Sequence, residues 1–302
     1  MIIKAFAKIN LAIDVKKKDE NGYHDIDMVT LPITLHDVLE MEQLISRHGI
    51  FITSDDPSLI CDEGNLAFKA LKAMEDNFSF SKGYRIQIYK RIPMNAGLGG
   101  GSADAAGIIR AICKLYNMDA HDPKIIKVAR SIGSDVPFCL LNKPARVLGT
   151  GENIIPLDSK LDYHVIIIKP HKGLSTKDVY EKYDTIPKEE REHPDISALI
   201  EAIKIGDEQK MFENMKNGLY KPASLLCPVI SGILNDFKKM GFPLYSMTGS
   251  GNACFALSKD LEQIEKAKNY FTSLNYITIT ASTNLTNQET IYNSSLFSHK
   301  GA

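Results

Sequence analysis

The sequence predicts an α/β protein with two domains, because strand-like and helix-like segments alternate along most of its 302 residues. Hydrophobic residues make up 44% of the chain and charged residues 24%, which is typical of a globular protein with an ordinary core. A chain of this length accommodates one large or two medium-sized domains. We expect a first domain over residues 1–160 and a second over residues 161–302, with the last strand free to return to the first domain.

The strands of the first domain are predicted from apolar runs that end at turn-like segments. Residues 2–15 form the first strand, because the charged, glycine-containing stretch 16–22 breaks the pattern after them. Residues 28–35 and 38–44 are two further strands that can pair with it. Residues 84–92 form a fourth strand, which leads directly into a glycine-rich loop.

Helices of the first domain are predicted where apolar residues recur at helical spacing. Residues 65–74 and 103–116 each carry an apolar face of this kind. A third helix over residues 122–132 ends at Gly133. The order of strands and helices therefore favours helices packed on one sheet.

The second domain is predicted to begin near a short apolar strand over residues 165–168. The charged stretch 186–194 is bounded by prolines and reads as a solvated loop. Helices are predicted around residues 196–203 and 229–240. After residue 283 the chain is polar, so we expect one last strand and a frayed end.

Charge and cysteine content exclude several classes of protein. The formal net charge is −1, so there is no basic field to attract nucleic acid or an acidic membrane surface. The five cysteines lie far apart and form no CxxC pair, so neither a zinc site nor a disulfide framework is indicated. No signal peptide and no long apolar span are evident, and we expect a cytoplasmic protein.

The segment Pro93–Ala106 is the most informative part of the chain. Four of the five residues from Gly97 to Gly101 are glycine, and a predicted helix follows them. Without a Cβ, such a loop lets backbone N–H groups approach a bulky anion, and the start of the helix favours negative charge. The segment therefore predicts a phosphate-binding loop. The alternative is a glycine-rich turn packed tightly against a neighbouring segment.

The glycine loop differs from the common nucleotide-binding motifs. A Walker A loop needs Lys and then Ser or Thr after its last glycine, whereas Gly101 is followed by Ser102 and Ala103. Ser102 also stands where the dinucleotide fingerprint has its third glycine. Neither HRD nor DFG occurs in the chain, which excludes the protein kinases.

Three further segments have the composition of functional loops. Asp135, within residues 133–138, lies between the end of a helix and an apolar stretch predicted to be a strand, although an isolated Asp is more often a turn or cap residue. Lys8 and Asn10 share one side of the first strand, either as site residues or as a solvent-facing pair. Residues 248–255 form a second glycine-rich loop, which by itself also fits a hairpin turn.

Together these four segments resemble the GHMP kinase superfamily. The glycine loop is similar to its ATP-phosphate motif, and residues 248–255 are similar to its third motif. The resemblance is strongest to the members that phosphorylate a cytidine-diphosphate-linked methylerythritol, and it covers most of residues 5–182. The supporting segments are residues 7–11, 22–24, 64–66, 93–106, 133–138, 149–152 and 173–180.

The resemblance implies a two-domain α+β fold with the site in the cleft between the domains. The N-terminal domain would be ribosomal-protein-S5-like and hold ATP, and the C-terminal domain would be ferredoxin-like and close the substrate side. The chain departs from the family pattern at three places: Asn142-Lys143 replaces Gly-Gly, Tyr220 replaces Glu, and Asn252 replaces Pro. None of these departures removes a catalytic group.

The resemblance also implies the catalytic and ATP-binding residues. Asp135 would take the proton of the acceptor hydroxyl, and Lys8 would lie beside that hydroxyl. Asn65, Leu66 and Lys90 would line the adenine pocket. The loop residues implied to bind ATP are Pro93, Asn95, Ala96, Gly97, Leu98, Gly99, Gly100, Gly101 and Ser102.

Mg²⁺ is expected to accompany ATP, because it neutralises charge on the phosphates. Ser102 is a possible ligand, and a role as the N-cap of the following helix is the alternative. Asp104 is expected to interact with the positive end of that helix rather than with a metal ion. No residue is firmly assigned as a metal ligand.

For the acceptor, the resemblance implies that Tyr23 and Tyr180 stack on the cytosine base and that His24 reads its edge. Asn10 would contact the acceptor side. The remaining residues implied to bind the acceptor are Thr176, Gly249 and Ser250. The expected partner is thus a small molecule, with no nucleic acid and no membrane, for a monomer or weak homodimer.

Two alternatives stay open besides the cytidine-linked substrate. A divergent GHMP kinase acting on another small alcohol is compatible with the three departures. A non-catalytic nucleotide-binding sensor would be favoured by loss of Lys8 or Asp135, and both are present. A nucleic-acid-binding module is the weakest option, because the chain has no basic stripe with interleaved aromatic residues.

Overall fold

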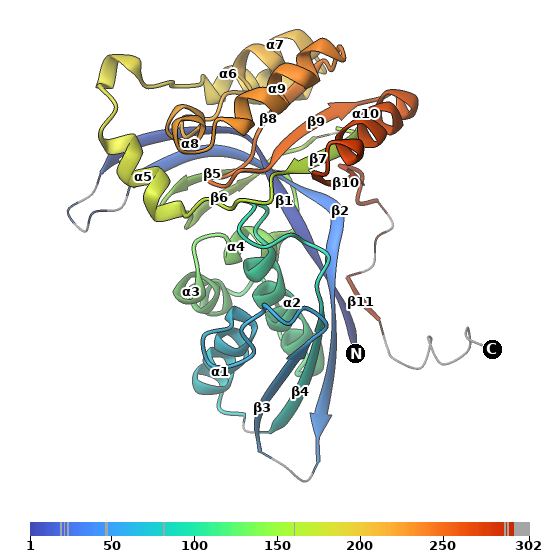
Figure 1. The fold of residues 1–302 in the computed structure, drawn as a ribbon. Helices are drawn as coiled ribbons and strands as arrows, with labels where there is room; N and C mark the ends of the chain where they lie inside the picture. The colour runs from blue at the N-terminus through green and yellow to red at the C-terminus, as the bar shows by residue number, and fades with distance from the viewer. Residues whose placement is uncertain are drawn as a thin grey trace.

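The computed structural model describes most of the chain, and Figure 1 shows how its elements are arranged. The residues outside the description are 19, 21, 23, 46, 47, 81, 160, 287, 289 and 293–302. Within the described part, no helix has the length and apolar character needed to cross a membrane.

The first sheet is built around two long antiparallel strands. Its strands run in the order β11-β1-β2-β4-β3, with β5 paired to another part of β2 and β6 paired to β5. The bounds are β1 (Ile2–Lys18), β2 (His24–Leu44), β3 (Gly49–Ser54), β4 (Gly83–Tyr89), β5 (Ala145–Gly149), β6 (Asn153–Pro156) and β11 (Ile291–Tyr292). The last strand does return to the first sheet, where Ile2 pairs with Tyr292.

Strand β2 differs from the sequence prediction of two strands over 28–35 and 38–44, because it is continuous through residues 36 and 37. His36 and Asp37 interrupt the apolar pattern, yet both stay in the ladder with β1. Residues 38–44 of β2 pair with β4, and residues 26–30 pair with β5. One strand therefore supports two separate parts of the first sheet.

Four helices cover one face of the first sheet (Figure 1). They are α1 (Leu66–Phe78), α2 (Gly100–Leu115), α3 (Pro123–Ile132) and α4 (Val136–Leu141). Asn65 and Asp122 cap α1 and α3, since their side chains accept hydrogen bonds from the backbone N–H groups two residues on. Helix α2 lies between the sheet and its neighbours and is buried along most of its length.

The apolar stretch after Asp135 is helix α4 rather than the predicted strand. Its six residues are too few to show a helical period, and Val136, Phe138 and the leucines fit a strand equally well. Pro137 in the first turn is the signal that favours a helix, because it has no N–H group to leave unpaired there.

The second sheet has four antiparallel strands in the order β10-β7-β9-β8. Its strands are β7 (His164–Lys169), β8 (Leu244–Met247), β9 (Cys254–Ser258) and β10 (Ile277–Ser282). The helices of this half are α5 (Thr176–Asp184), α6 (Ile196–Ile205), α7 (Glu208–Asn214), α8 (Tyr220–Leu226), α9 (Val229–Lys239) and α10 (Leu261–Ser273). Inside the predicted charged loop, Lys188–Glu190 forms one 3-10 turn.

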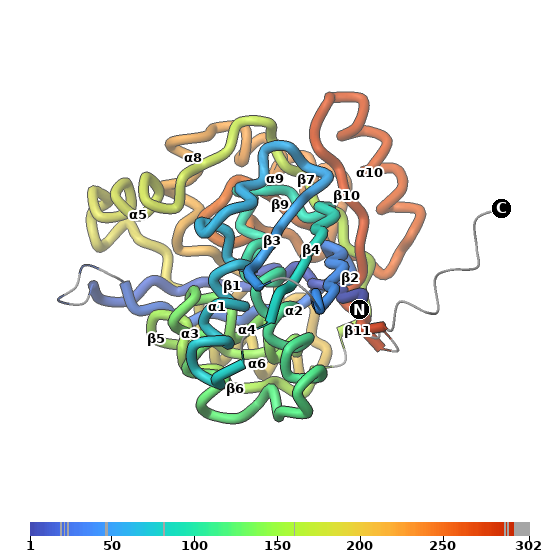
Figure 2. Tube along the Cα trace, turned by 90° about the horizontal axis from the view of Figure 1, so that it is seen from below, coloured from blue at the N-terminus to red at the C-terminus, as the bar shows by residue number. Residues whose placement is uncertain are grey.

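The two halves are joined along β1. The C-terminal part of β1 contacts the second half. The Ile13 N–H group donates to Lys216 O, and the Ile13 carbonyl accepts from the N–H group of Gly218. Figures 1 and 2 both place α5 near the C-terminal end of β1, at Lys18, and the N-terminal end of β2, at His24. The site lies where these elements meet.

Candidate active site

Two residues of β1, Lys8 and Asn10, form the centre of the site. Lys8 Nζ donates a hydrogen bond of 2.8 Å to Asn10 Oδ1, and the residues are 5% and 1% exposed. The two side chains share one side of the strand, as predicted, and they are buried rather than solvent-facing. The β1–β2 register shifts between Phe6 and Lys8 and again between Asn10 and Ala12. Such irregularities re-aim side chains beside functional sites.

Neighbouring hydroxyl groups hold Asn10 in one orientation. Its backbone N–H group donates to Thr248 Oγ1 at 3.0 Å, and its Nδ2 donates to Thr30 Oγ1 at 2.9 Å. Nδ2 also donates to Met28 Sδ at 3.2 Å, so both side-chain amide hydrogens are used away from Lys8 and the amide oxygen accepts from the ammonium group. Asn10 therefore fixes the position of Lys8.

Asp135 completes an ion pair with the same lysine. Lys8 Nζ lies 3.5 Å from Asp135 Oδ2, and the Asp135 side chain is 32% exposed. Asp135 immediately precedes α4, but its side chain makes no capping hydrogen bond to that helix. Its carboxylate is thus turned to the cavity beside Lys8 rather than used by local structure.

The glycine loop leads into α2 through two residues with left-handed backbone conformation. Gly97 has φ 74° and Gly99 has φ 72°, which side chains other than glycine adopt at a cost. Gly99 occupies the N-cap position and α2 begins at Gly100. The alternative role of Ser102 as the N-cap is therefore wrong, because the helix starts two residues before it.

The loop is tied to β1 and to the second glycine-rich loop. The Lys8 N–H group donates to Leu98 O at 3.0 Å. A Cβ on Gly97 would overlap the carbonyl oxygen of Thr248, and a Cβ on Gly251 would lie 2.5 Å from the carbonyl carbon of Ala96. The two loops thus pack backbone against backbone, so the expectation of a tightly packed turn also holds.

Two of the cavities that border the glycine loop contain most of the predicted site residues. The larger, of about 750 Å³, is lined by residues of both halves, and the smaller, of about 310 Å³, lies on the other side of the loop. Both are lined by Gly97, Gly99 and Ser102. The larger cavity holds most of the predicted acceptor and catalytic residues, namely Lys8, Asn10, His24, Asp135, Thr176, Tyr180, Gly249 and Ser250.

The smaller cavity contains most of the residues predicted to bind ATP. It is lined by Leu66, Lys90 and the unbroken run from Ile92 to Ser102. Asn65 does not line it, because its side chain accepts from the Ala67 N–H group and donates to Ile60 O. Asn65 caps α1, and Leu66, the first residue of that helix, lines the cavity.

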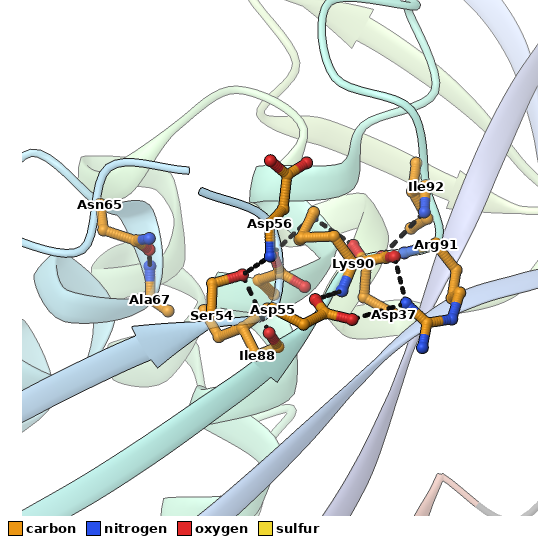
Figure 3. A network of polar contacts seen from close by, with 11 residues as sticks. Asp37, Ser54, Asp55, Asp56, Asn65, Ala67, Ile88, Lys90, Arg91 and Ile92 are labelled. Carbon is orange, nitrogen blue, oxygen red and sulfur yellow. Dashed lines mark hydrogen bonds and ion pairs between the residues drawn. The ribbon is translucent and has the colours of Figure 1, made fainter. Parts of the chain in front are cut away.

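Lys90 belongs to a buried ionic network that sequence reasoning missed (Figure 3). Its Nζ donates to Asp37 Oδ2 and, at 2.9 Å, to Asp104 Oδ2. Asp104 was expected to interact with the positive, N-terminal end of α2. It lies instead in the second turn, buried against Lys90. That interpretation is wrong, because the helix begins earlier than expected and turns Asp104 inward.

Burial makes Asp104 hard to ionise. Loss of water raises the pKa of Asp104 to about 8, and the nearby charge of Asp37 acts in the same direction, while Lys90 opposes both. The ordinary value is 3.8. Between these two pH values the folded protein keeps a proton that the unfolded chain has released. The free energy of unfolding therefore falls as the pH rises through this range.

We expect Asp104→Asn to remove this part of the pH dependence, because asparagine is neutral at every pH. From about pH 5 to pH 8, the free energy of unfolding should fall more steeply for the unaltered protein, by up to about 1.4 kcal/mol per pH unit. Urea titrations of both proteins across this range measure the two slopes. Equal slopes would contradict the buried, protonated carboxyl.

At the far end of the larger cavity, His24 lies among aromatic and charged side chains. Its ring stacks on Tyr180 with centroids 5.3 Å apart, and its Nε2 lies 2.9 Å from Asp184 Oδ1. Lys18 Nζ donates to Asp184 Oδ2 at 2.6 Å. Burial would raise the pKa of Asp184, but Lys18 and His24 outweigh it and hold that pKa below its usual range. Tyr23 lies outside the described residues.

The loops around Ser250 close another side of the site. Thr176 Oγ1 and Ser250 Oγ share a hydrogen bond of 2.8 Å, which joins the start of α5 to the second glycine-rich loop. Asn217 Nδ2 donates to the carbonyl oxygens of Met247 and Gly249, both at 2.9 Å. Sequence reasoning missed Asn217, since its partners lie 30 residues or more along the chain.

Three of the residues that depart from the family pattern make contacts outside the Lys8–Asp135 pair. Asn142 ends α4 with φ 52°, a conformation that suits glycine and that Asn tolerates better than most residues. The Tyr220 hydroxyl hydrogen-bonds to Ser231 Oγ at 3.0 Å. Asn252 is fully buried, and its Nδ2 donates to Lys172 O, whereas its Oδ1 has no hydrogen-bond partner among the described residues. None of the three contacts Lys8 or Asp135 in the described structure.

The architecture and the site can be compared with known proteins. Residues 65–143 match the GHMP kinases N terminal domain, and residues 199–277 match the GHMP kinases C terminal domain. A Clostridium beijerinckii protein named 4-diphosphocytidyl-2-C-methyl-D-erythritol kinase is 38% identical over 261 residues, covering 86% of this chain and 92% of that protein. The chain belongs to the GHMP kinase family. The family and two-domain fold expected from the sequence are thereby confirmed.

Other GHMP kinases support the same assignment. A Caldicellulosiruptor bescii protein of the same name is 35% identical over 257 residues, covering 85% of this chain and 89% of that protein. A crystal structure of a 4-(cytidine 5'-diphospho)-2C-methyl-D-erythritol kinase has a TM-score of 0.79 at 29% identity, covering 93% of this chain and 98% of that one.

Homoserine kinase from Cytophaga hutchinsonii has a TM-score of 0.71 at 20% identity, covering 94% of each chain, which shows a shared fold. GHMP kinases are small-molecule kinases that take the phosphoryl group from ATP. The chain is a small-molecule kinase of this family.

Proposed function

We propose that this kinase transfers the γ-phosphoryl group of ATP to the 2-hydroxyl of 4-diphosphocytidyl-2-C-methyl-D-erythritol, a step of non-mevalonate isoprenoid synthesis. One observation carries the proposal. Lys8 and Asp135 face a cavity of about 750 Å³ at the place where it reaches the glycine loop. An alcohol bound there would lie between a base and the phosphate-binding backbone. The relatives that carry the name of this activity support the choice of acceptor.

In the proposed reaction, Asp135 accepts the proton of the acceptor hydroxyl, and the oxygen attacks the γ-phosphorus as ADP leaves. Phosphoryl transfer depends mainly on positioning and on stabilising charge. Lys8 Nζ lies 3.5 Å from the Asp135 carboxylate, so its ammonium group would stabilise the negative charge that develops on the acceptor oxygen as the proton leaves. The N–H groups at the start of α2 would hold the phosphates.

Mg²⁺ is part of the proposal, and the residues present fit an ion that ATP delivers. Within the described residues no cluster of three His, Cys, Asp or Glu side chains could hold a metal ion. Mg²⁺ commonly binds through substrate phosphates, water and only one or two protein groups. Ser102 lines both cavities and is the candidate protein ligand. The ion would neutralise charge on the phosphates.

The far end of the larger cavity suits a cytosine base. A carboxylate can only accept, so Asp184 fixes the proton of a neutral His24 on Nε2 and leaves Nδ1 as an acceptor. Cytosine presents an amino donor where uracil presents a carbonyl acceptor. An acceptor at His24 Nδ1 can bind the amino group of cytosine but not the carbonyl group of uracil, so the site favours cytosine. Tyr180 offers an aromatic surface next to His24, and we keep Tyr23 as its proposed partner in stacking.

The direct test measures ADP release by the purified protein with Mg-ATP. The acceptors to compare are the cytidine-linked methylerythritol, methylerythritol 4-phosphate, mevalonate, homoserine and galactose. Turnover confined to the cytidine compound is the expected result. Activity on another alcohol alone would indicate a divergent paralogue, and ATP binding without turnover would indicate a nucleotide-binding sensor. Either of these results contradicts the proposal.

Asp184→Asn should weaken recognition of the cytidine end while sparing chemistry, because asparagine no longer dictates which nitrogen of His24 carries the proton. We expect KM for the cytidine-linked acceptor to rise about three- to tenfold, as for loss of one hydrogen bond. KM for ATP and kcat should stay within about twofold. Steady-state kinetics with each substrate varied in turn measures these constants.

Asp178→Asn is the matched control on the same helix, because Asp178 is exposed and its side chain makes no hydrogen bond within the described structure. Its constants should equal those of the unaltered protein. An unchanged KM for the acceptor in Asp184→Asn would contradict the proposal that Asp184 orients His24 to bind cytosine.

A further inference from the structure

The buried ionic network beneath the glycine loop joins three elements that are far apart in the sequence. Asp37 comes from β2, Lys90 follows β4, and Asp104 comes from α2. The side chains of these residues are 0%, 5% and 2% exposed, respectively. Figure 3 shows Lys90 and Asp37 pointing toward each other at the end of β4. Two carboxyl groups therefore share one ammonium group away from water.

Asp37 also holds the backbone of the segment that enters the glycine loop. Its Oδ1 accepts hydrogen bonds from the N–H groups of Arg91, at 2.6 Å, and Ile92, at 2.8 Å (Figure 3). These two N–H groups lie just beyond the end of β4 and have no partner in the β-ladder. Asp37 thus sets the direction in which the chain leaves the sheet.

The same segment packs against the start of α2. A Cβ on Gly100 would lie 3.1 Å from Ile92 Cγ2 and 3.4 Å from Lys90 Nζ. Gly100 is the first residue of α2, whose N–H groups face the phosphate-binding region. Any displacement of Lys90 or Ile92 would therefore displace the backbone that is proposed to bind phosphate.

The ammonium group of Lys90 is committed to this network. Within the described residues its hydrogen bonds go to Asp37 and Asp104. Burial lowers the pKa of Lys90, but its interactions with Asp104 and Asp37 outweigh burial and raise that pKa, so the group stays charged. Lys90 also lines the smaller cavity. It can shape the nucleotide pocket with its stem while its charge is held by protein groups.

Stability does not explain such a network. Buried ion pairs commonly add little to the stability of a fold, and apolar side chains of similar volume often serve as well or better. What the network does supply is a fixed geometry, because each charged group loses much of its stabilisation when it moves away from the others. That geometry is located at the base of the glycine loop.

We propose that Asp37, Lys90 and Asp104 are positioning residues that set the shape of the nucleotide site by clamping residues 90–92 against the first turn of α2. The inference rests on the proposed use of ATP. Of the two acidic residues, Asp37 has the larger effect, because it contacts both Lys90 and the backbone. The network acts on ATP and not on the acceptor, which occupies the other side of the loop.

The test is Asp37→Asn, with binding of Mg-ATP measured by calorimetry and KM measured for each substrate. Asparagine retains an acceptor for the backbone N–H groups but places an amide near the Lys90 ammonium. We expect Kd and KM for ATP to rise at least about tenfold, as for loss of a charged hydrogen bond. KM for the acceptor and kcat should stay within about threefold. Because Kd for ATP is measured without acceptor, the result is independent of which alcohol is phosphorylated.

Two further variants separate positioning from stability. Glu42→Gln is the matched control, since Glu42 lies on the same strand and its ion pair with Arg85 is exposed. Its constants should not change. Asp37→Asn/Lys90→Met removes the mispaired ammonium, so stability should recover while ATP binding stays weak. Recovery of both, or an unchanged Kd for ATP in folded Asp37→Asn, would overturn the proposal.

Discussion

An Asp135→Asn protein is expected to bind Mg-ATP with unchanged affinity and to turn over about a thousandfold more slowly, within the range for loss of a general base. Asparagine has nearly the same shape as aspartate but cannot accept the hydroxyl proton. The side chain is one-third exposed and caps no helix, so the fold should not depend on it. Calorimetry with ATP and single-turnover kinetics measure the two effects separately.

The control for this variant is Asp158→Asn. Asp158 is exposed and its side chain makes no hydrogen bond or ion pair within the described residues, so its kcat should match that of the unaltered protein. If Asp135→Asn kept its kcat, the proposed base would be wrong. If it lost ATP binding to the same extent as turnover, Asp135 would belong to the nucleotide site instead.

Gly97→Ala should damage stability and ATP binding together. The residue has φ 74°, which costs an alanine about 1–2 kcal/mol. Its new Cβ would also overlap the Thr248 carbonyl oxygen, and backbone cannot swing aside as a side chain can. Overpacking of this kind costs about 1–3 kcal/mol more. We expect a loss of at least about 2 kcal/mol by urea denaturation and a clear rise in Kd for ATP.

Gly206→Ala separates the effect of the left-handed φ from the effect of overlap between the new Cβ and its neighbours. Gly206 has nearly the same φ, 73°, yet nothing lies within 4 Å of the position that its Cβ would take. It ends α6, far along the chain from the glycine loop. This variant should lose about 1 kcal/mol and bind ATP normally. Similar losses in both variants would mean that the two glycine loops do not pack as closely as the structure indicates.

The parts of the site that sequence could predict are those that local geometry determines. Lys8 and Asn10 are two residues apart on a strand, so they must share a side, and their hydrogen bond follows from that. The glycine loop could be predicted because its glycines are consecutive or nearly so in the sequence and a helical pattern follows them directly. In the structure it is both a loop at a helix start and a turn packed on residues 248–251.

What the sequence could not predict depends on contacts between distant segments. Asp37 meets Lys90 across 53 residues, and in the sequence it looks like any polar residue between two strands. His24 meets Asp184 across 160 residues. In the second case a local signal existed, because Asp184 stands one helical turn after Tyr180 on α5. The burial of Asp104 had no such signal.

Strand β11 determines the order in which the molecule can be completed during synthesis. Its two residues pair with Ile2 and Ile3, and the Lys4 N–H group donates to Thr290 O at 2.8 Å. The ribosome makes the second sheet before it makes this strand. Until then, the newly made β1 has an open backbone edge that other chains can pair with. Ile2 and Ile3 pair with β2 on one side, and they gain their partner on the other side only after nearly 290 further residues have been added.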